Sequence, residues 1–535
     1  MNVLEYAGRK LQMAKTLIEA GVVRPTRPDR LLRSGLALQR WGPTAAAGYA
    51  TSAIRYPDDL ALVDDLGSLT FAEVHRRTNG LAHALADRGV GEGDRVAILC
   101  RNHRGIVDIT VACSKLGAHA LYLNTMFSGP QITQVCARER PKAIVFDEEF
   151  AALVAEAGRR RQRFVAWAEP ESAGRHGDEL LEHLIAGGDP SDVVPPSQKG
   201  RIVILTSGTT GSPKGADRKQ PESLEPVAAL LDRIPYRARE RTHVAAPIFH
   251  SWGYANWMLA ISLSSTVVLR RRFTPEGCLS ATAQLRCSGL VVVPVMLQRI
   301  LELPVEIIDR YDVRALRVIA ASGSALPGEL AIEVMDRFGD VLYNLYGSTE
   351  VAWATIATPA DLRAAPGTAG RPPRGTVVKL LDDDGREVAP GQTGRIFVGN
   401  EMAMEGYTGG GHKQNIGGLL SSGDVGHFDE DDRLFIDGRD DEMIVSGGEN
   451  VFPREVEDCL AAHPAVEEVA VVGVDDPQFG QRLKAFVVAR TDVDADTLKR
   501  HVKSNLAAYK VPREIVFVGE LPRNETGKIL KRQLA

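Results

Sequence analysis

The chain has 535 residues, of which 44% are hydrophobic and 25% are charged. This length favours more than one domain, and the composition is that of a folded protein and excludes a disordered chain. Lys and Arg number 64 against 69 Asp and Glu, for a net charge of −5. This balance does not favour a protein that coats nucleic acid.

Two patterns concern the cellular setting. The six cysteines include no C-x-x-C pair, which fits neither a disulfide scaffold nor a zinc ribbon and predicts reduced, buried thiols. No apolar run reaches the roughly 18 residues of a membrane-spanning helix, and the N-terminus lacks the apolar segment and cleavage site of a signal peptide. We therefore expect a cytoplasmic protein.

Residues 1–50 are expected to form a helical extension. Apolar residues recur at helical spacing over residues 3–22, with basic residues on the remaining surface. This pattern predicts a helix that packs against its own domain, and its basic residues leave peripheral contact with a membrane as an alternative.

A large α/β domain is predicted over residues 51–438. Short apolar runs alternate with helix-length amphipathic stretches, as in parallel sheets covered on both faces. From about residue 375, Asp-Gly and Pro-Gly turn signals indicate a β-rich subdomain that extends to residue 438. The expected elements include a helix at 69–89 and strands at 95–100, 202–205, 290–293 and 316–321.

The last part of the chain, residues 439–535, predicts a small α+β domain. Three apolar strands and two amphipathic helices are enough to bury a separate core. The strands are expected at 469–474, 485–489 and 515–518, and the helices at 454–462 and 495–506.

The most informative segment, residues 206–215, follows directly on the expected strand 202–205. Its glycines allow backbone N–H groups to converge on an anion, its hydroxyls add donors, and Lys214 adds a positive charge. It is not a Walker A loop, because that motif ends in Gly-Lys-Ser/Thr whereas Lys214 follows Pro213. A phosphate-binding loop is therefore predicted. The residues expected to bind the phosphate are Thr206, Ser207, Gly208, Thr209, Thr210, Gly211 and Lys214.

This loop resembles the signature loop of the adenylate-forming superfamily, which includes acyl-CoA synthetases, luciferases and peptide-synthetase adenylation domains. The chain supplies segments similar to the other motifs of the family in the expected order, from about residue 58 to its end. The resemblance, strongest to bacterial fatty acyl-CoA ligases, implies a large domain with parallel sheets and a small C-terminal domain joined to it by a hinge.

Residues 346–350 resemble the second core motif of that family. The resemblance implies that Tyr346 stacks on adenine, that Thr349 contacts the α-phosphate, and that Glu350 holds Mg²⁺ together with Thr206. Asn344 is expected to bind the adenine amino group. The other residues implied around the nucleotide are Gly323, Ser324, Ala325, Gly347 and Ser348.

Three later motifs complete the implied nucleotide site. Asp424, in a segment similar to Thr-Gly-Asp, would accept hydrogen bonds from the ribose hydroxyls, and Arg439 would contact ribose or phosphate. Asp441 would be the hinge pivot, and Lys528 would reach into the adenylation site. A Gly-rich stretch at 409–418 replaces the usual helical approach to Asp424, so the local geometry there is left open.

Two segments imply binding of the acid and of coenzyme A. Residues 247–253 look like the His-x-x-Gly segment of the family, in which His250 would neutralise or orient the substrate carboxylate. Trp252, Gly253 and Tyr254 would line the acyl pocket. Residues 446–457 are similar to the segment that faces the CoA tunnel, with Ser446, Gly447 and Gly448 as the expected contacts.

The family chemistry implies two half-reactions on one site. A carboxylate attacks the α-phosphate of Mg-ATP to give acyl-adenylate and pyrophosphate, and the CoA thiol then attacks the adenylate after the small domain rotates. The expected ligands are thus a carboxylic acid, ATP, Mg²⁺ and CoA. A medium- or long-chain fatty acid is favoured as the acid, and an aryl or short-chain acid fits the same pocket. A homodimer is left open.

Three other functions are alternatives for a chain with these motifs. A fatty acyl-AMP ligase that delivers to a carrier protein usually carries an insertion before the small domain, and none is found here. A stand-alone amino-acid adenylation domain would place an Asp early in the pocket, and none lies between Phe249 and Leu263. A non-catalytic acyl or nucleotide sensor has no need of Lys528. The sequence therefore favours an AMP-forming acid–CoA ligase with a role in fatty acid metabolism.

Overall fold

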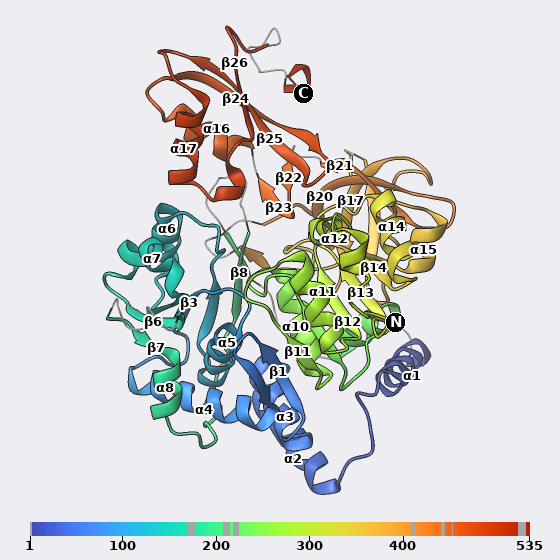
Figure 1. Ribbon diagram of the computed structural model, residues 1–535. Coiled ribbons are helices and arrows are strands. Elements are labelled where there is room, and N and C mark those ends of the chain that lie inside the picture. Colours follow the sequence, from blue (N-terminus) through green and yellow to red (C-terminus); the bar gives the residue numbers. More distant parts are fainter. Residues whose placement is uncertain are drawn as a thin grey trace.

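The computed structural model describes residues 3–169, 177–206, 214–217, 224–382, 384–407, 410, 412–439, 444–451, 453–522 and 531–534. No helix in these ranges has both the length and the apolar composition needed to cross a membrane. The expected α/β class is confirmed, with two mostly parallel sheets in a large domain and a small α+β domain at one end of it (Figure 1).

The first large sheet has eight strands in the order β18-β9-β8-β4-β3-β5-β6-β7. The strands from β3 to β8 run parallel, whereas β9 and β18 are antiparallel additions at one edge. The strands are β3 Arg95–Leu99, β4 His119–Tyr122, β5 Ala143–Asp147, β6 Gln162–Trp167, β7 Glu179–Leu180, β8 Ile202–Thr206, β9 Lys214–Asp217 and β18 Gly406–Tyr407. The accompanying helices are α4 Phe71–Asp87, α5 Arg104–Leu116, α6 Gly129–Glu139, α7 Ala151–Gly158 and α8 Leu181–Gly187.

The second large sheet has the order β15-β14-β13-β12-β10-β11-β1-β2 and is parallel except at its two edges. Its strands β12 and β13 are apolar throughout because both faces are covered. The strands are β1 Leu60–Asp64, β2 Gly67–Thr70, β10 Arg241–Val244, β11 Thr266–Val268, β12 Gly289–Val292, β13 Val318–Ala321, β14 Leu342–Tyr346 and β15 Thr355–Ala357. The helices are α9 Glu225–Arg233, α10 Ser251–Ser262, α11 Pro275–Gln284, α12 Pro294–Leu301, α13 Val305–Ile308, α14 Gly328–Phe338 and α15 Pro359–Ala364.

Two five-stranded sheets complete the fold. The β-rich subdomain is antiparallel, as the turn signals after residue 375 predict. Its strands are β16 Val377–Leu381, β17 Gly394–Gly399, β19 Asn415–Ile416, β20 Leu419–Phe428 and β21 Leu434–Arg439. The small domain contains β22 Ile444–Ser446, β23 Glu449–Val451, β24 Val466–Asp476, β25 Gly480–Ala489, β26 Glu514–Phe517, α16 Pro453–Ala461 and α17 Ala495–Asn505.

The chain begins with three helices, of which α2 and α3 lie at the end of the large domain away from the small domain, whereas α1 lies at the side of the large domain (Figure 1). They are α1 Val3–Glu19, α2 Pro28–Trp41 and α3 Ala45–Arg55. Leu17 of α1 and Leu231 of α9 belong to one buried cluster, so α1 packs against its own domain as predicted.

The start of α5 joins the two large sheets. Arg104, the first residue of α5, forms an ion pair with Asp64 at the end of β1, with Nη2 and Oδ1 2.6 Å apart. The same carboxylate accepts a hydrogen bond from the backbone N–H of Arg104 at 2.8 Å. Burial disfavours the charged carboxylate, but its hydrogen bonds to Arg104 outweigh this effect and lower the pKa of Asp64.

Candidate active site

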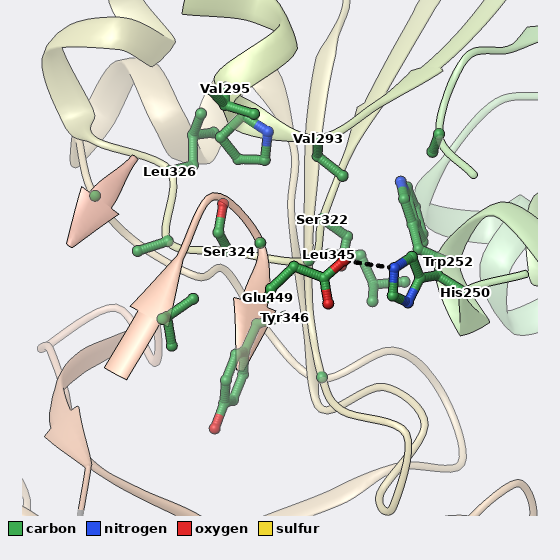
Figure 2. Close-up of a pocket in the computed structure, with 18 of the residues that line it drawn as sticks. His250, Trp252, Val293, Val295, Ser322, Ser324, Leu326, Leu345, Tyr346 and Glu449 are labelled. Atoms are coloured by element: carbon green, nitrogen blue, oxygen red, sulfur yellow. Dashed lines mark hydrogen bonds and ion pairs between the residues drawn. The ribbon is translucent and has the colours of Figure 1, made fainter. Parts of the chain in front are cut away.

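A cavity of about 1020 Å³ lies between the large domain, the β-rich subdomain and the small domain. Loops that follow β12, β13 and β14 form one wall, the start of α10 forms a second, and small-domain residues 444–449 and 476–481 form a third (Figure 2). The carboxyl ends of parallel strands are the usual place for ligands in α/β sheets.

The structure brings together the residues expected at adenine and ribose. The Tyr346 hydroxyl, at the end of β14, donates a hydrogen bond to Asp424 Oδ2 at 2.5 Å. Asn344 is only 7% exposed, and its Oδ1 has no hydrogen-bond partner within the described ranges. A buried acceptor without a partner is costly, so this oxygen suits an amino group of a bound ligand.

The approach to Asp424 is a tight hairpin, which answers the question left open by the Gly-rich stretch. Ile416 and Leu419 pair across β19 and β20. Between them Gly417 and Gly418 have φ values of 58° and 86°, as a two-residue turn of this kind requires. Ser422 Oγ then accepts a hydrogen bond from the backbone N–H of Asp424 at 3.1 Å, which holds the backbone at this position.

Glu350 is held by a residue that no sequence motif indicated. The hydroxyl of Tyr407, on β18, donates a hydrogen bond to Glu350 Oε1 at 3.0 Å. Tyr407 pairs with Ala216 on β9, the strand that leaves the phosphate loop. The carboxylate oxygens of Glu350 are of the type that Mg²⁺ prefers, so this residue suits the expected metal.

Replacing Tyr407 by Phe is expected to raise the KM for MgATP about tenfold with a smaller change in kcat. A hydrogen bond to a charged group contributes about 1.5–3 kcal/mol, and its loss frees the Glu350 carboxylate to turn away from the phosphates. Steady-state kinetics at varied MgATP tests this expectation. An unchanged KM would contradict this expectation. The matched control is Tyr311→Phe, at a position distant in sequence from this contact.

His250 contacts the small domain directly. Its Nε2 donates a hydrogen bond to Glu449 Oε1 at 2.8 Å, and Asn124 Nδ2 lies 3.3 Å from both carboxylate oxygens (Figure 2). Burial disfavours the charged imidazole, but the attraction of Glu449 outweighs it and raises the pKa of His250. Burial likewise opposes the charge of Glu449, and His250 outweighs it and lowers the pKa of that carboxyl. Both groups are therefore favoured in their charged forms.

The hairpin that carries Glu449 also places two expected CoA residues in the cavity. Ser446 pairs with Glu449, and Gly447 and Gly448 form the turn between them with φ values of 59° and 86°. A Cβ atom on Gly448 would lie 3.7 Å from Gly323 O, so the tip of the hairpin lies within van der Waals range of the expected adenine loop. Gly323, Ser324 and Ala325 all line the same cavity.

A second contact fixes the position of the small domain. The N–H of Ala508 donates to Met126 O at 3.2 Å, and Ser128 Oγ donates to Asn505 O at 3.0 Å. Ala507 is buried within a core cluster of the large domain. The small domain thus touches the large domain on both sides of the cavity mouth.

The expected acyl-pocket residues separate into two groups. Trp252 and Gly253 line the cavity, and Trp252 Nε1 donates to Val292 O at 2.9 Å. The expectation for Tyr254 needs correction: its ring centroid lies 5.9 Å from that of Tyr122 and 5.7 Å from that of Trp257, and it packs on the core instead of lining the cavity. Positions 252 and 254 are two residues apart on α10, a rotation of about 200°, so Tyr254 lies on the opposite face of the helix from Trp252.

Apolar side chains dominate the end of the cavity beside Trp252, with one polar pair among them. The buried Tyr236 hydroxyl donates to Asn256 Oδ1 at 3.2 Å. Further lining residues at this end are Leu230, Ile234, Leu259, Leu345, Trp353 and Met402.

Several expected residues lie outside the described ranges, namely Ser207, Gly208, Thr209, Thr210, Gly211, Asp441 and Lys528. For Thr206, Lys214 and Arg439 only the backbone is described; Arg439 pairs with Asp424 across β20 and β21. Gly347, Ser348 and Thr349 line the cavity, and Thr349 Oγ1 lies 3.4 Å from Ser251 Oγ.

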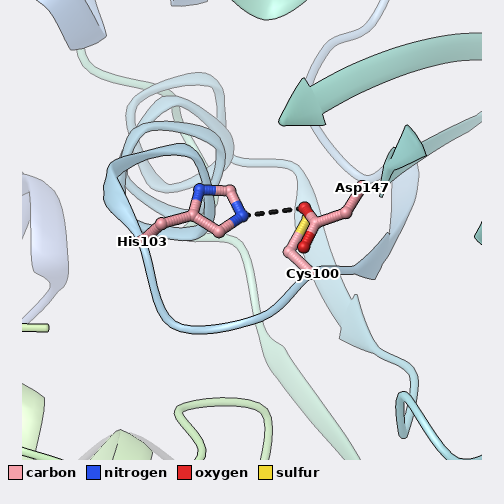
Figure 3. A group of neighbouring side chains, drawn as sticks. All are labelled: Cys100, His103 and Asp147. Atoms are coloured by element: carbon pink, nitrogen blue, oxygen red, sulfur yellow. Dashed lines mark hydrogen bonds and ion pairs between the residues drawn. The ribbon is translucent and has the colours of Figure 1, made fainter. Parts of the chain in front are cut away.

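A buried cluster of Cys100, His103 and Asp147 has the ligand types of a metal site, with their ligand atoms within 4.8 Å of one another (Figure 3). Its hydrogen bonds indicate a structural role. His103 Nδ1 accepts from the N–H of Gly105 at 3.0 Å, which leaves the proton on Nε2 to be donated to Asp147 at 2.7 Å. Burial raises the pKa of the Cys100 thiol, which keeps it protonated. We assign this cluster to capping α5.

Comparison with known protein families gives two matches. Residues 49–408 match the model of the AMP-binding enzyme, and residues 455–528 match that of the AMP-binding enzyme C-terminal domain. The chain belongs to the AMP-binding enzyme family. The adenylate-forming superfamily expected from the sequence is thereby confirmed.

Relatives within the AMP-binding family include ligases for different acids. The chain is 34% identical over 493 residues to an indoleacetate–CoA ligase of Aromatoleum aromaticum, covering 90% of this chain and 94% of the relative. It is 30% identical over 495 residues to a fatty acid–[acyl-carrier-protein] ligase of Streptomyces coeruleorubidus, covering 89% and 93%.

Two solved structures of one family member differ in their likeness to this chain. A double mutant of o-succinylbenzoate CoA synthetase from Bacillus subtilis, bound with its product analogue, has a TM-score of 0.78 at 27% identity, covering 91% of this chain and 98% of that one. The same synthetase with its acyl-adenylate intermediate has a TM-score of 0.65 at 26% identity, covering 91% and 97%.

Proposed function

We propose that this protein is an ATP-dependent acid–CoA ligase that forms an acyl-adenylate and then a CoA thioester. The observation that carries the proposal is the cavity shared by the large and small domains, which combines an adenosine-type site with a small-domain hairpin at its mouth. The family match supports the same reaction class.

In the proposed first half-reaction, the large domain binds ATP. Tyr346 offers its ring to adenine, Asn344 Oδ1 accepts from the amino group, and Asp424 accepts from the ribose hydroxyls. Mg²⁺ held at Glu350 would neutralise charge on the phosphate oxygens. His250 orients the incoming carboxylate, and Lys214 and Lys528 supply positive charge to the phosphates as the resemblance implies.

In the proposed second half-reaction, the small domain presents the CoA tunnel. The higher likeness to the product-analogue complex than to the acyl-adenylate complex supports the inference that the small domain stands here in the thioester-forming position. The hairpin at Gly447 and Gly448 lies beside the adenine loop and Glu449 reaches His250. In this position the thiol would enter past the hairpin and attack the acyl carbonyl, and AMP would leave.

For the acid we propose an aromatic carboxylate as the first candidate. The relatives named for indoleacetate and o-succinylbenzoate support it, as do Trp252 and Trp353 along the cavity. The medium- or long-chain fatty acid expected from the sequence is the second candidate. It is favoured by the apolar lining residues and by the relative named for fatty acids.

The test is pyrophosphate release from ATP with a panel of aryl and C2 to C20 acids, each assayed with and without CoA. We expect acid-dependent release and a CoA thioester, with an aryl acid giving the highest kcat/KM. Adenylate without thioester would favour delivery to a carrier protein. No release with any acid, despite ATP binding, would overturn the proposal and favour a sensor.

A further inference from the structure

Helix α2 is turned with its leucines outward. Leu31, Leu32, Leu36 and Leu38 are 41–66% exposed, whereas the buried face of the helix consists of Ser34, Ala37 and Trp41. An amphipathic helix on a globular surface normally buries its leucines and exposes its small polar residues. The arrangement in α2 is the reverse, so the leucine face is available to something outside the chain.

The segments that precede α2 in the sequence also expose apolar side chains. Leu11 and Ile18 of α1 and Val23 after it are also exposed. Seven of the fifteen large apolar side chains that the described ranges expose therefore fall between residues 11 and 38. This part of the chain precedes the family match, which begins at residue 49, so the surface lies outside the region that the family model describes.

The same extension is strongly basic. Residues 1–41 contain eight Lys and Arg against three Asp and Glu, a net charge of +5 within a chain of net charge −5. The rest of the chain therefore carries −10. At 100° per residue, Arg33 and Arg40 of α2 fall directly beside the leucine stripe, and both are exposed. Exposed Arg24 and Arg27 precede the helix.

We propose that the leucine face of α2, with its flanking arginines, docks on an anionic lipid surface. A leucine face with arginines along one edge fits a helix that lies in the membrane interface, with the apolar side chains among the acyl chains and the guanidinium groups at the phosphates. Tryptophan at the end of such a helix is common, but Trp41 here is buried and serves to anchor α2 to α3.

The charge pattern favours lipid over a second copy of the chain. In a two-fold dimer the same surface of both molecules forms the contact. Arg33 and Arg40 would therefore lie near the same arginines of the second molecule. An anionic surface neutralises these charges instead. The face also lies at the opposite end of the molecule from the small domain (Figure 1), so docking leaves the cavity mouth free.

The test is sedimentation of the full-length protein with vesicles of phosphatidylglycerol and phosphatidylcholine, compared with vesicles of phosphatidylcholine alone. We expect binding to the anionic vesicles only, weakened when salt is raised from about 0.05 M to about 0.5 M because the Debye length shortens. The double variant Leu31→Gln/Leu32→Gln should lower the partition coefficient at least about tenfold. Arg33→Gln/Arg40→Gln should abolish the preference for anionic lipid.

The control is Leu66→Gln/Val377→Gln, which removes two equally exposed apolar side chains elsewhere on the large domain and should bind vesicles as the wild type does. Circular dichroism and pyrophosphate release should be unchanged in all three variants, because none touches the cavity. Equal binding by wild type and the leucine variant would overturn the proposal. So would a concentration-dependent dimer in sedimentation velocity that the leucine variant abolishes, since a second copy would then be the occupant.

Discussion

Replacing Glu449 by Ala is expected to slow CoA thioester formation about 100-fold while leaving acid-dependent pyrophosphate release within about threefold of wild type. The carboxylate is the small-domain partner of His250 and Asn124. Removing one member of a hydrogen-bonded charge pair between two surfaces costs about 2–5 kcal/mol, and this cost falls only on the domain arrangement that makes the contact. Separate assays of adenylate and thioester measure the two half-reactions.

Two companion variants sharpen this test. Glu449→Gln keeps the shape and one hydrogen bond, so it should fall between the wild type and the Ala variant. Glu467→Ala removes an exposed carboxylate from the same domain and should change neither assay. Equal loss of both half-reactions in Glu449→Ala would contradict a role confined to the thioester-forming position.

The contact also predicts a pH dependence. Because the pKa of His250 is raised from its ordinary value of 6.5, the ionic contribution is complete below that value and is lost as pH rises through the raised pKa. Because the pKa of Glu449 is lowered from 4.5, the contribution is present above that value and is lost in more acidic solution. The ratio of wild-type to Glu449→Ala thioester rates should therefore fall as the solution is made alkaline.

Replacing Asp64 by Ala is expected to destabilise the large domain by about 3–5 kcal/mol, because it leaves the Arg104 guanidinium without its buried partner. The Asp64 side chain is fully buried, and it accepts hydrogen bonds from both the backbone and the side chain of Arg104. The pair joins β1 of one sheet to α5 of the other, so the loss reaches the interface between the sheets. The shift of the urea midpoint, read with the slope, measures the effect.

The neighbouring residue provides the control. Asp65 pairs with Arg270 at 3.0 Å, but both side chains are partly exposed, so Asp65→Ala should cost no more than about 1 kcal/mol. Since the pKa of Asp64 is lowered, the difference between wild type and Asp64→Ala should be complete above the ordinary value of 3.8 and shrink as pH falls below it. Equal midpoints for the two variants would show that the buried pair does not stabilise the fold.

The sequence predicted the elements well because their signals are local. The apolar runs at 290–293 and 316–321 became β12 and β13, displaced by no more than two residues, since a strand buried on both faces must be apolar throughout. The motif residues Tyr346 and Asp424 also meet, although 78 positions separate them. Here the family resemblance supplied the long-range information that the residues alone do not contain.

What the sequence missed depends on contacts between distant segments. Tyr407 contacts Glu350 because β18 joins the edge of the first sheet. A two-residue strand has no local sequence pattern from which this pairing could be predicted. Glu449 contacts Asn124, which lies 325 positions away in the sequence. This contact depends on how the two domains are arranged. Tyr254 was misplaced because a run of aromatic residues on a helix does not reveal which face meets the core.

In the proposed reaction, the imidazole of His250 binds two different groups, the substrate acid and Glu449. In the proposed reaction its Nε2 edge orients the acid before adenylation, and in the present arrangement it is occupied by Glu449. The two uses exclude each other, so the hairpin can settle only after the free carboxylate has become an uncharged acyl group. In the proposed reaction, the contact between His250 and Glu449 would therefore form only after adenylation and before the thiol enters. Excess free acid should accordingly slow the formation of the CoA thioester.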